Sequence, residues 1–246
     1  MNMRKVEKNT PIPLYYQLKE IIQEMIDSGE LKPDEPIPTE RELCAIHGIS
    51  RMTAREAIMA LVNEGVLYRE QGKGTFVSQP KLRHQLSELK GLTEDMEKLG
   101  HKVETKILSF SVQEASKRIA KSLQLPEGQE KVIQLERLRI VDQIPYAIET
   151  VWLNQAKCFN LTQPCLEGNS LYQILRERYS LIPHYARQTV EPIKLNEYES
   201  ELLGVDKESL ALLFRRTTYS PTDEIIEHTK GIYRIDKHKF EIILKA

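Results

Sequence analysis

Apolar residues recur at helical spacing near the start of this chain, over residues 13–28. The apolar positions of this segment are Tyr15, Leu18, Ile22, Met25 and Ile26. They fall on one face of a helix, so the pattern predicts an amphipathic helix that packs in a core. The first eight residues show no such pattern, and we expect them to be disordered.

Two further helical patterns follow, separated by a tight turn. Thr39 and Glu42 have the spacing of a capping box, which starts the first helix at Glu40, and Gly48 ends it. Ser50 caps the second helix. The second helix has the apolar face Ala54, Ala57, Ile58, Leu61 and Val62, and its first turn and opposite face carry Arg51, Met52, Thr53, Arg55 and Glu56. This arrangement is typical of a recognition helix whose N-terminal end enters the major groove.

Two short strand patterns come next, Val66–Glu70 and Thr75–Val77, joined by a glycine-rich tip. The tip contains Gly72, Lys73 and Gly74. Glycine allows a close approach of the backbone, so such a tip can contact DNA phosphates or enter the minor groove. The helices and the hairpin together predict a winged helix-turn-helix.

Beyond residue 102 the pattern changes to runs rich in Val, Ile, Tyr and Thr, which predict strands. We expect strands near 103–111, 130–141, 145–153, 184–193, 209–220, 223–235 and 238–244, and helices near 113–123, 169–180 and 196–203. Turns at Asp142-Gln143 and at 221–223 form hairpins, so the fold class is α+β, an antiparallel sheet with helices on one side. The expected domains are a winged helix-turn-helix at 1–79, a linker at 80–90 and a second domain at 91–246.

Length and composition agree with two globular domains. The chain has 246 residues, 40% of them hydrophobic and 29% charged. No apolar run approaches the about 18 residues of a membrane helix, and no export signal is visible, so we expect a cytoplasmic protein without a membrane partner. Three cysteines without C-x-x-C spacing and six scattered histidines indicate no disulfide framework and no metal site. Nothing indicates a cofactor.

Net charge does not reveal a nucleic-acid partner. The whole chain has a formal net charge of −1, and residues 1–79 carry ten Lys and Arg against twelve Asp and Glu. Binding must therefore come from the clustering of basic residues on the face predicted to meet DNA. These residues are Arg41, Arg51, Arg55, Arg69 and Lys73.

Polar residues recur on the strands of the second domain. Arg137 and Arg139 are two positions apart on one strand and therefore point to the same face. Neighbouring strands carry Glu149, Glu191, Glu227, Tyr233 and Arg234. An arginine pair beside carboxylates can hold an anionic group through bidentate hydrogen bonds. The alternative is a solvent-exposed face laced with salt bridges, and the pattern alone leaves both open.

The first domain resembles the DNA-binding domain of the GntR family of bacterial transcription regulators. The matching segments are PIPLYYQLKEII (11–22), GELKPDEPIPTERELC (29–44), ISRMTAREAIMALVNEGVLYR (49–69) and QGKGTFV (71–77). The remainder resembles the UTRA effector-binding domain of the HutC subfamily. Its matching segments are LTEDMEKLGHKV (92–103), RLRIVDQIPYAIE (137–149), SLYQILRERY (170–179) and residues 212–242. Within the subfamily, the chain is most similar to repressors of N-acetylglucosamine utilisation.

The resemblance implies a repressor that binds double-stranded operator DNA as a homodimer and responds to a metabolite. We expect Arg41 and Thr53 to hold phosphates, Arg51 and Arg55 to read guanines, and the wing to reach the minor groove. The full set of DNA-binding candidates is Thr39, Arg41, Ser50, Arg51, Met52, Thr53, Arg55, Gly72, Lys73 and Gly74.

In similar regulators an effector pocket is lined by residues that match seven positions of this chain, which makes a pocket the favoured interpretation. These are Arg137, Arg139, Glu149, Ser170, Tyr172, Glu227 and Tyr233, and the further candidates Lys90 and Gly91 could supply a point charge and a backbone N–H to the same ligand. Ser170 also has the position of a helix N-cap, and Tyr172 that of a packing residue. Amino-sugar regulators carry two hydroxyl residues where this chain has Lys90 and Gly91. The expected effector is a small anionic metabolite such as glucosamine-6-phosphate or N-acetylglucosamine-6-phosphate, with a non-sugar metabolite as the alternative.

An enzyme is the rival class, because the UTRA domain resembles chorismate lyase in fold. Fold does not carry function, however. The sequence shows no legible nucleophile–base pair and no phosphate-binding G-x-x-x-x-G-K-[ST] motif. We therefore expect no catalytic residues.

Overall fold

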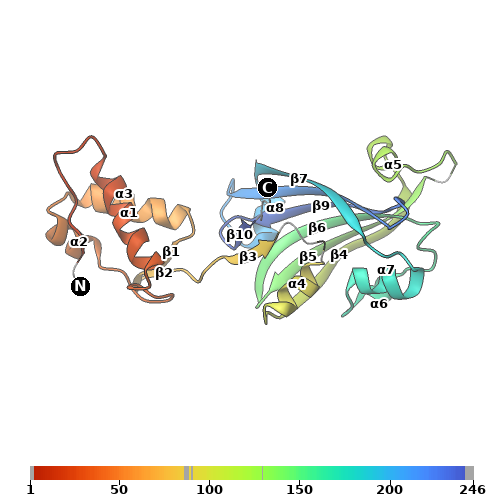
Figure 1. The fold of residues 1–246 in the computed structure, drawn as a ribbon, viewed down its shortest axis with the longest axis horizontal. Helices are drawn as coiled ribbons and strands as arrows, with labels where there is room; N and C mark the ends of the chain where they lie inside the picture. The colour runs from red at the N-terminus through yellow and green to blue at the C-terminus, as the bar shows by residue number, and fades with distance from the viewer. Residues whose placement is uncertain (1–2, 86–88, 90, 129, 242–246) are drawn as a thin grey trace. The chain divides into compact units, whose positions relative to one another are not determined.

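The chain forms two compact units, Met1–Leu82 and Arg83–Ala246. The computed structural model describes residues 3–85, 89, 91–128 and 130–241 (Figure 1). Within the segment expected to be a linker, β3 (Leu82–Gln85) pairs with β10 (His238–Glu241) in a two-stranded sheet. None of the helices in the described ranges is long and apolar enough to cross a membrane.

The first unit is a three-helix domain with a small wing. Its elements are α1 (Leu14–Asp27), α2 (Glu40–His47), α3 (Arg51–Asn63), β1 (Leu67–Glu70) and β2 (Gly74–Val77). The capping box of Thr39 and Glu42 is present, and Gly48 ends α2 at φ 62°, a left-handed conformation that favours glycine. Side chains of all three helices meet in one core, which confirms the predicted amphipathic patterns.

The N-terminal residues depart from the expectation. Met3 and Val6 are buried, each about 8% exposed, and belong to the core of the three helices. Disorder is therefore wrong for residues 3–8. Two apolar side chains in a polar segment are too few to make a periodic pattern, yet they suffice to attach the segment to the core.

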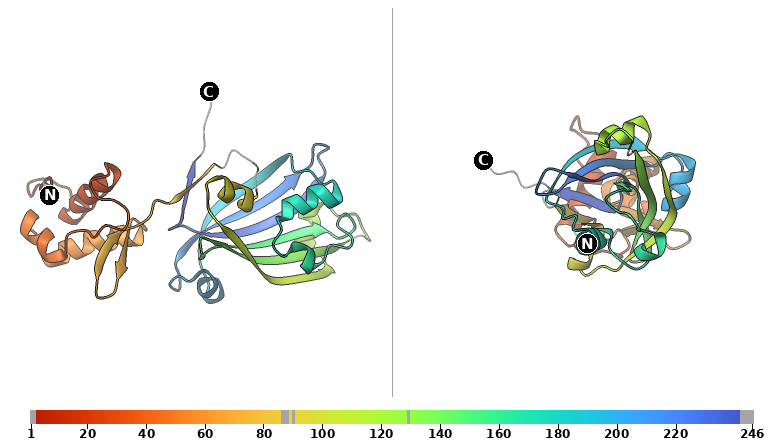
Figure 2. Two further views of the ribbon diagram at one scale, coloured as in Figure 1. Left: turned by 90° about the horizontal axis from the view of Figure 1, so that it is seen from below. Right: turned by 90° about the vertical axis from the view of Figure 1, so that its right-hand side faces the viewer.

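The second unit contains a six-stranded antiparallel sheet in the order β4-β5-β6-β9-β8-β7, strongly twisted as Figure 2 shows. The strands are β4 (Val103–Glu114), β5 (Lys131–Val141), β6 (Ile144–Asn154), β7 (Tyr185–Lys194), β8 (Leu210–Tyr219) and β9 (Ile225–Arg234). Asp142 and Gln143 both have positive φ, at 47° and 68°, between the paired residues Val141 and Ile144. This is the geometry of a two-residue hairpin, as predicted.

Helices cover both faces of this sheet, so the expectation of helices on one side is wrong (Figure 1). The helices are α4 (Leu92–Lys98), α5 (Lys117–Leu123), α6 (Gln163–Leu166), α7 (Leu171–Tyr179) and α8 (Glu197–Leu203). Helices α6 and α7 pack on Val151 and Leu153 of β6, whereas α8 packs beside Ile148 and α5 against Trp152. Alternate residues of a strand point to opposite faces. Both faces of β6 are therefore apolar, and each needs a cover.

Two helix N-caps of the second unit provide a matched test of stability. Asn196 forms a capping box with Glu199, whose backbone N–H lies 2.8 Å from the Asn196 Oδ1. Ser170 occupies the same position at α7 but makes no side-chain capping bond. We expect Asn196→Ala to lower the unfolding free energy by about 1 kcal/mol and Ser170→Ala to leave it nearly unchanged, as measured by urea denaturation. Equal losses would show that Ser170 is an ordinary cap.

Candidate functional site

The N-terminal end of α3 presents an exposed polar surface. Arg51, Met52 and Arg55 are exposed, and Met52 keeps 73% of its accessible area. The Ser50 Oγ accepts a hydrogen bond from the Thr53 backbone N–H (3.2 Å) and lies 2.9 Å from the Thr53 Oγ1. The cap therefore fixes the first turn of α3, while its longer side chains reach into solvent.

Glu40, the first residue of α2, holds two arginines of this surface. Its carboxylate lies 4.0 Å from the Arg51 Nε and 3.6 Å from the Arg69 Nη2. The pattern of basic residues in the sequence did not predict a role for Glu40. Glu40 and Arg51 are, however, the first residues of α2 and α3, the two helices joined by the turn. Glu40 thus links the recognition helix to the wing.

The remaining DNA-binding candidates lie on exposed parts of the same unit. Thr39, Arg41, Gly72, Lys73 and Gly74 are exposed, and the Lys73 Nζ lies 3.1 Å from the Glu70 Oε1. Thr53 is half-buried. An exposed lysine at a hairpin tip is free to exchange its carboxylate partner for a phosphate, because surface ion pairs contribute little.

In the second unit, Glu149 of β6 joins three candidates in one buried cluster. Its Oε2 accepts hydrogen bonds from the Arg137 Nη2 (2.9 Å) and the Arg139 Nη1 (3.1 Å), and its Oε1 accepts one from the Tyr233 hydroxyl (2.8 Å). Gly231 makes this possible, since a Cβ there would meet the Tyr233 Cε2 at 2.6 Å. The register of β5, β6 and β9 brings these residues together.

A second carboxylate on the same face, Glu227, accepts hydrogen bonds through one of its oxygens. Its Oε1 accepts hydrogen bonds from the Tyr172 hydroxyl (2.6 Å) and the Thr218 Oγ1 (3.0 Å). Tyr172 comes from α7, so the cluster ties this helix to the sheet. Burial is the first cause that raises the pKa of the Tyr172 hydroxyl, and the Glu227 carboxylate adds to it.

The cluster is buried, so the alternative that these residues form a solvent-exposed face of salt bridges is wrong. Arg137, Arg139, Glu149 and Glu227 are 8%, 3%, 6% and 3% exposed. Burial alone would raise the pKa of Glu149, but the guanidiniums of Arg139 and Arg137 and the Tyr233 hydroxyl lower it to about 2. Glu149 is therefore ionised at neutral pH.

Arg216 is a third arginine beside this cluster. Its Nε donates to the Gln188 Oε1 at 2.7 Å, and none of the carboxylates in the described residues lies within ion-pair distance of it. Among the described residues of this face, three guanidiniums thus lie beside two carboxylates. Strands β8 and β9 pair across the hairpin at residues 221–223, which puts Arg216 on the same face as Glu227. The strand alternation on either side of this turn could therefore have predicted Arg216 as a member of the site.

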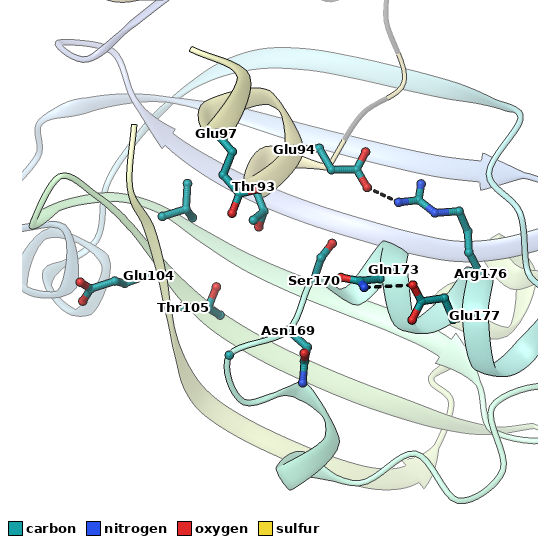
Figure 3. A pocket seen from close by; sticks show the side chains of 12 residues that line it. Thr93, Glu94, Glu97, Glu104, Thr105, Asn169, Ser170, Gln173, Arg176 and Glu177 are labelled. Atoms are coloured by element: carbon teal, nitrogen blue, oxygen red, sulfur yellow. Dashed lines mark hydrogen bonds and ion pairs between the residues drawn. The ribbon is translucent and has the colours of Figure 1, made fainter. Parts of the chain in front are cut away.

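A cavity of about 670 Å³ lies next to the cluster, between α4, β4 and the start of α7 (Figure 3). Figure 3 shows Thr93 and Glu94 entering from α4 and Ser170 and Gln173 from the α7 end, with Glu94 paired to Arg176 across the two helices. The lining also includes Glu97, Glu104, Thr105 and Glu177. The cavity is therefore rich in carboxylates and hydroxyls.

The cavity and the arginine cluster meet at Thr93. The Arg139 Nη2 donates to the Thr93 Oγ1 at 2.6 Å, and Thr93 lines the cavity. Among the predicted effector residues, Ser170 also lines the cavity, whereas a Cβ added at Gly91 would lie 3.6 Å from the Tyr172 Cδ2. Lys90 lies outside the described residues. Sequence reasoning missed Thr93, because nothing in a helical T-E-D-M segment indicates a partner on a distant strand.

Comparison with known proteins identifies both units. The model of the bacterial regulatory proteins, gntR family, matches residues 14–77, and the UTRA domain model matches residues 98–239. The chain is 37% identical over 236 residues to the HTH-type transcriptional repressor NagR of Bacillus subtilis, covering 96% of each protein. It is 30% identical to the histidine utilization repressor of Pseudomonas putida, covering 94% of this chain and 92% of that protein.

Solved structures support the same relationship. The crystal structure of PhnF from Mycobacterium smegmatis matches with a TM-score of 0.65 and 26% sequence identity, covering 93% of this chain and 99% of PhnF. The effector domain of PhnF alone matches with a TM-score of 0.63. The chain therefore belongs to the GntR family, as a HutC-type member with a UTRA domain, and is a ligand-responsive transcriptional repressor rather than an enzyme.

Proposed function

We propose that this repressor is released from its operator by a small anionic metabolite that binds beside the buried arginines of the second unit. The observation that carries the proposal is the imbalance of three guanidiniums and two carboxylates on one face of the sheet. A buried charge without a partner is costly. An anionic ligand would add negative charge beside the three guanidiniums, which favours its binding there.

Hydrogen-bond donors remain available in the cluster. The Nε atoms of Arg137 and Arg139 are buried and have no partner among the described residues. Buried donors of this kind normally find an acceptor. A phosphate or carboxylate oxygen is a suitable acceptor, because guanidinium groups bind such oxygens in a fixed, planar geometry.

The neighbouring cavity restricts the rest of the ligand. Its hydroxyls and carboxylates, from Thr93, Ser170, Glu97 and Glu177 among others, suit a ligand with hydroxyl or amino groups. An amino-sugar phosphate such as glucosamine-6-phosphate or N-acetylglucosamine-6-phosphate combines both requirements. The 37% identity to NagR supports this class.

A non-sugar metabolite is the second candidate. Relatives include repressors named for mannosyl-D-glycerate and for histidine utilization, so effectors differ among similar chains. Lys90 and Gly91 also replace the two hydroxyl residues of the amino-sugar regulators. Thermal-shift screening with amino-sugar phosphates, sugar phosphates and amino-acid catabolites distinguishes the two, because a ligand of the native state raises its melting temperature. A shift only with catabolites would overturn the amino-sugar assignment.

Operator binding requires two copies of the chain. Each chain has a single recognition helix, which reads about one half-site. In the proposed docking, Arg51 and Arg55 read guanines, Arg41 and Thr53 hold phosphates, and the wing reaches the minor groove. The effector then acts by reorienting the two DNA-binding units, whose spacing must match the half-sites.

Arg216 provides a test that separates ligand binding from structure. Since no carboxylate among the described residues lies within ion-pair distance of Arg216, Arg216→Met should lower the unfolding free energy by no more than about 1 kcal/mol, the loss of its hydrogen bond to Gln188. Loss of one charge-assisted hydrogen bond should weaken the effector found by screening about tenfold or more, as measured by calorimetry. Arg215→Met is the matched control, because Arg215 is ion-paired with Glu191 on the opposite face and should change neither quantity. A destabilised Arg216→Met with normal affinity would contradict the proposed site.

Base reading is tested on a duplex that the wild-type protein selects from a randomised library. Arg51→Ala should cost about 1–3 kcal/mol on that duplex and little on random DNA, because a bidentate guanine contact is lost. Lys73→Ala should weaken binding to both duplexes alike. If Arg51→Ala retains full affinity for the selected duplex at matched salt, the docking of α3 is wrong.

Assembly is tested by sedimentation equilibrium. We expect the full chain to have twice its monomer mass of 28.5 kDa, because symmetric half-sites need a symmetric dimer. Residues 90–246 alone should also be dimeric and residues 1–79 alone monomeric. A monomeric fragment 90–246 would place the dimer contacts elsewhere.

A further inference from the structure

An ordered N-terminal arm, residues 3–12, precedes α1 and lies before residues 14–77, which the GntR family model matches. Met3 and Val6 attach the arm to the helical core. The Arg4 Nη1 lies 3.8 Å from the Glu24 Oε2 of α1, at the surface. The arm is therefore part of the folded DNA-binding unit.

One side chain of α1 fixes the second half of the arm. The Gln17 Nε2 donates to the backbone oxygens of Glu7 (3.0 Å) and Ile12 (2.8 Å) and to the Thr10 Oγ1 (3.0 Å). Its Oε1 accepts from the Glu7 backbone N–H at 2.8 Å. These bonds hold the backbone on both sides of Lys8, which limits where the Lys8 side chain can reach.

The Lys8 side chain lies over the turn between α2 and α3. A Cβ added at Gly48, the residue that ends α2, would be 3.3 Å from the Lys8 Nζ. Lys8 is exposed, and no carboxylate in the described part of the chain forms an ion pair with it. Its ammonium group thus lies beside Gly48, two residues before the Ser50 cap of α3, without an anionic partner among the described residues.

We infer that Lys8 binds a backbone phosphate of the operator next to the helix-turn-helix turn. The inference rests on the proposed docking of α3. When the N-terminal end of α3 enters the major groove, the turn before it faces the edge of that groove, where phosphates lie. The ammonium group of Lys8 and the N-terminal end of α3 then both attract the same phosphate.

The test compares the salt dependence of DNA binding by fluorescence anisotropy, with the wild-type full chain and its variants on the selected duplex and on random DNA. Lys8→Ala should weaken both complexes and reduce the slope of log Kd against log salt by about one unit, since one fewer counterion is released. Arg4→Ala is the matched control, because Arg4 pairs with Glu24 of α1 and should leave the slope unchanged. Gln17→Ala should reduce the slope by part of the amount that Lys8→Ala does. The double variant Lys8→Ala, Gln17→Ala should have the same slope as Lys8→Ala alone.

The outcomes separate this inference from the docking itself. If Lys8→Ala leaves the slope unchanged while Arg51→Ala weakens the selected duplex, the arm does not bind phosphate, and the docking stands. If neither Lys8→Ala nor Arg51→Ala loses affinity, the Lys8 inference and the docking of α3 are both wrong. Equal slope changes in Lys8→Ala and Arg4→Ala would indicate a general charge effect and overturn the inference. Circular dichroism verifies that each variant remains folded.

Discussion

The second unit depends on one buried interaction, the set of hydrogen bonds that Glu149 accepts from Arg137, Arg139 and Tyr233. Removing these charges from water costs several kcal/mol per ion, and only close pairing offsets that cost. Three strands must keep their register for the four side chains to meet, and Gly231 must lack a side chain for the tyrosine to fit. Sheet geometry and the proposed ligand chemistry are thereby linked, because the same guanidiniums that Glu149 aligns carry the unpaired Nε donors offered to an anion.

The two units use arginine in different ways. On the first unit, Arg51 is 78% exposed in its side chain and only loosely paired with Glu40, so it can leave that partner for a base edge at little cost. On the second unit, Arg137 and Arg139 are nearly inaccessible, and both donate hydrogen bonds to Glu149. Exposed arginines suit a long, variable polyanion such as DNA, and buried ones suit a small ligand of fixed shape.

Much of this architecture was predictable from the sequence, because it depends on local rules. Caps at Thr39 and Ser50 set the helix starts, and strand alternation put Arg137 and Arg139 on one face. The remainder depends on contacts between distant segments. The bond from Arg139 to Thr93 spans 46 residues, and the pairing of Arg216 with Gln188 needs the order of the strands. The burial of Met3 and Val6 likewise has no periodic signal.

If the buried arginines select an anionic effector, a phosphate group must add to the affinity of a sugar. Isothermal titration calorimetry can compare glucosamine-6-phosphate and N-acetylglucosamine-6-phosphate, each with its unphosphorylated sugar. We expect the phosphorylated sugar of a pair to bind at least tenfold more tightly, since a charge-assisted hydrogen bond contributes about 1.5–3 kcal/mol. Equal affinity for a phosphorylated sugar and its unphosphorylated counterpart would contradict the anion site.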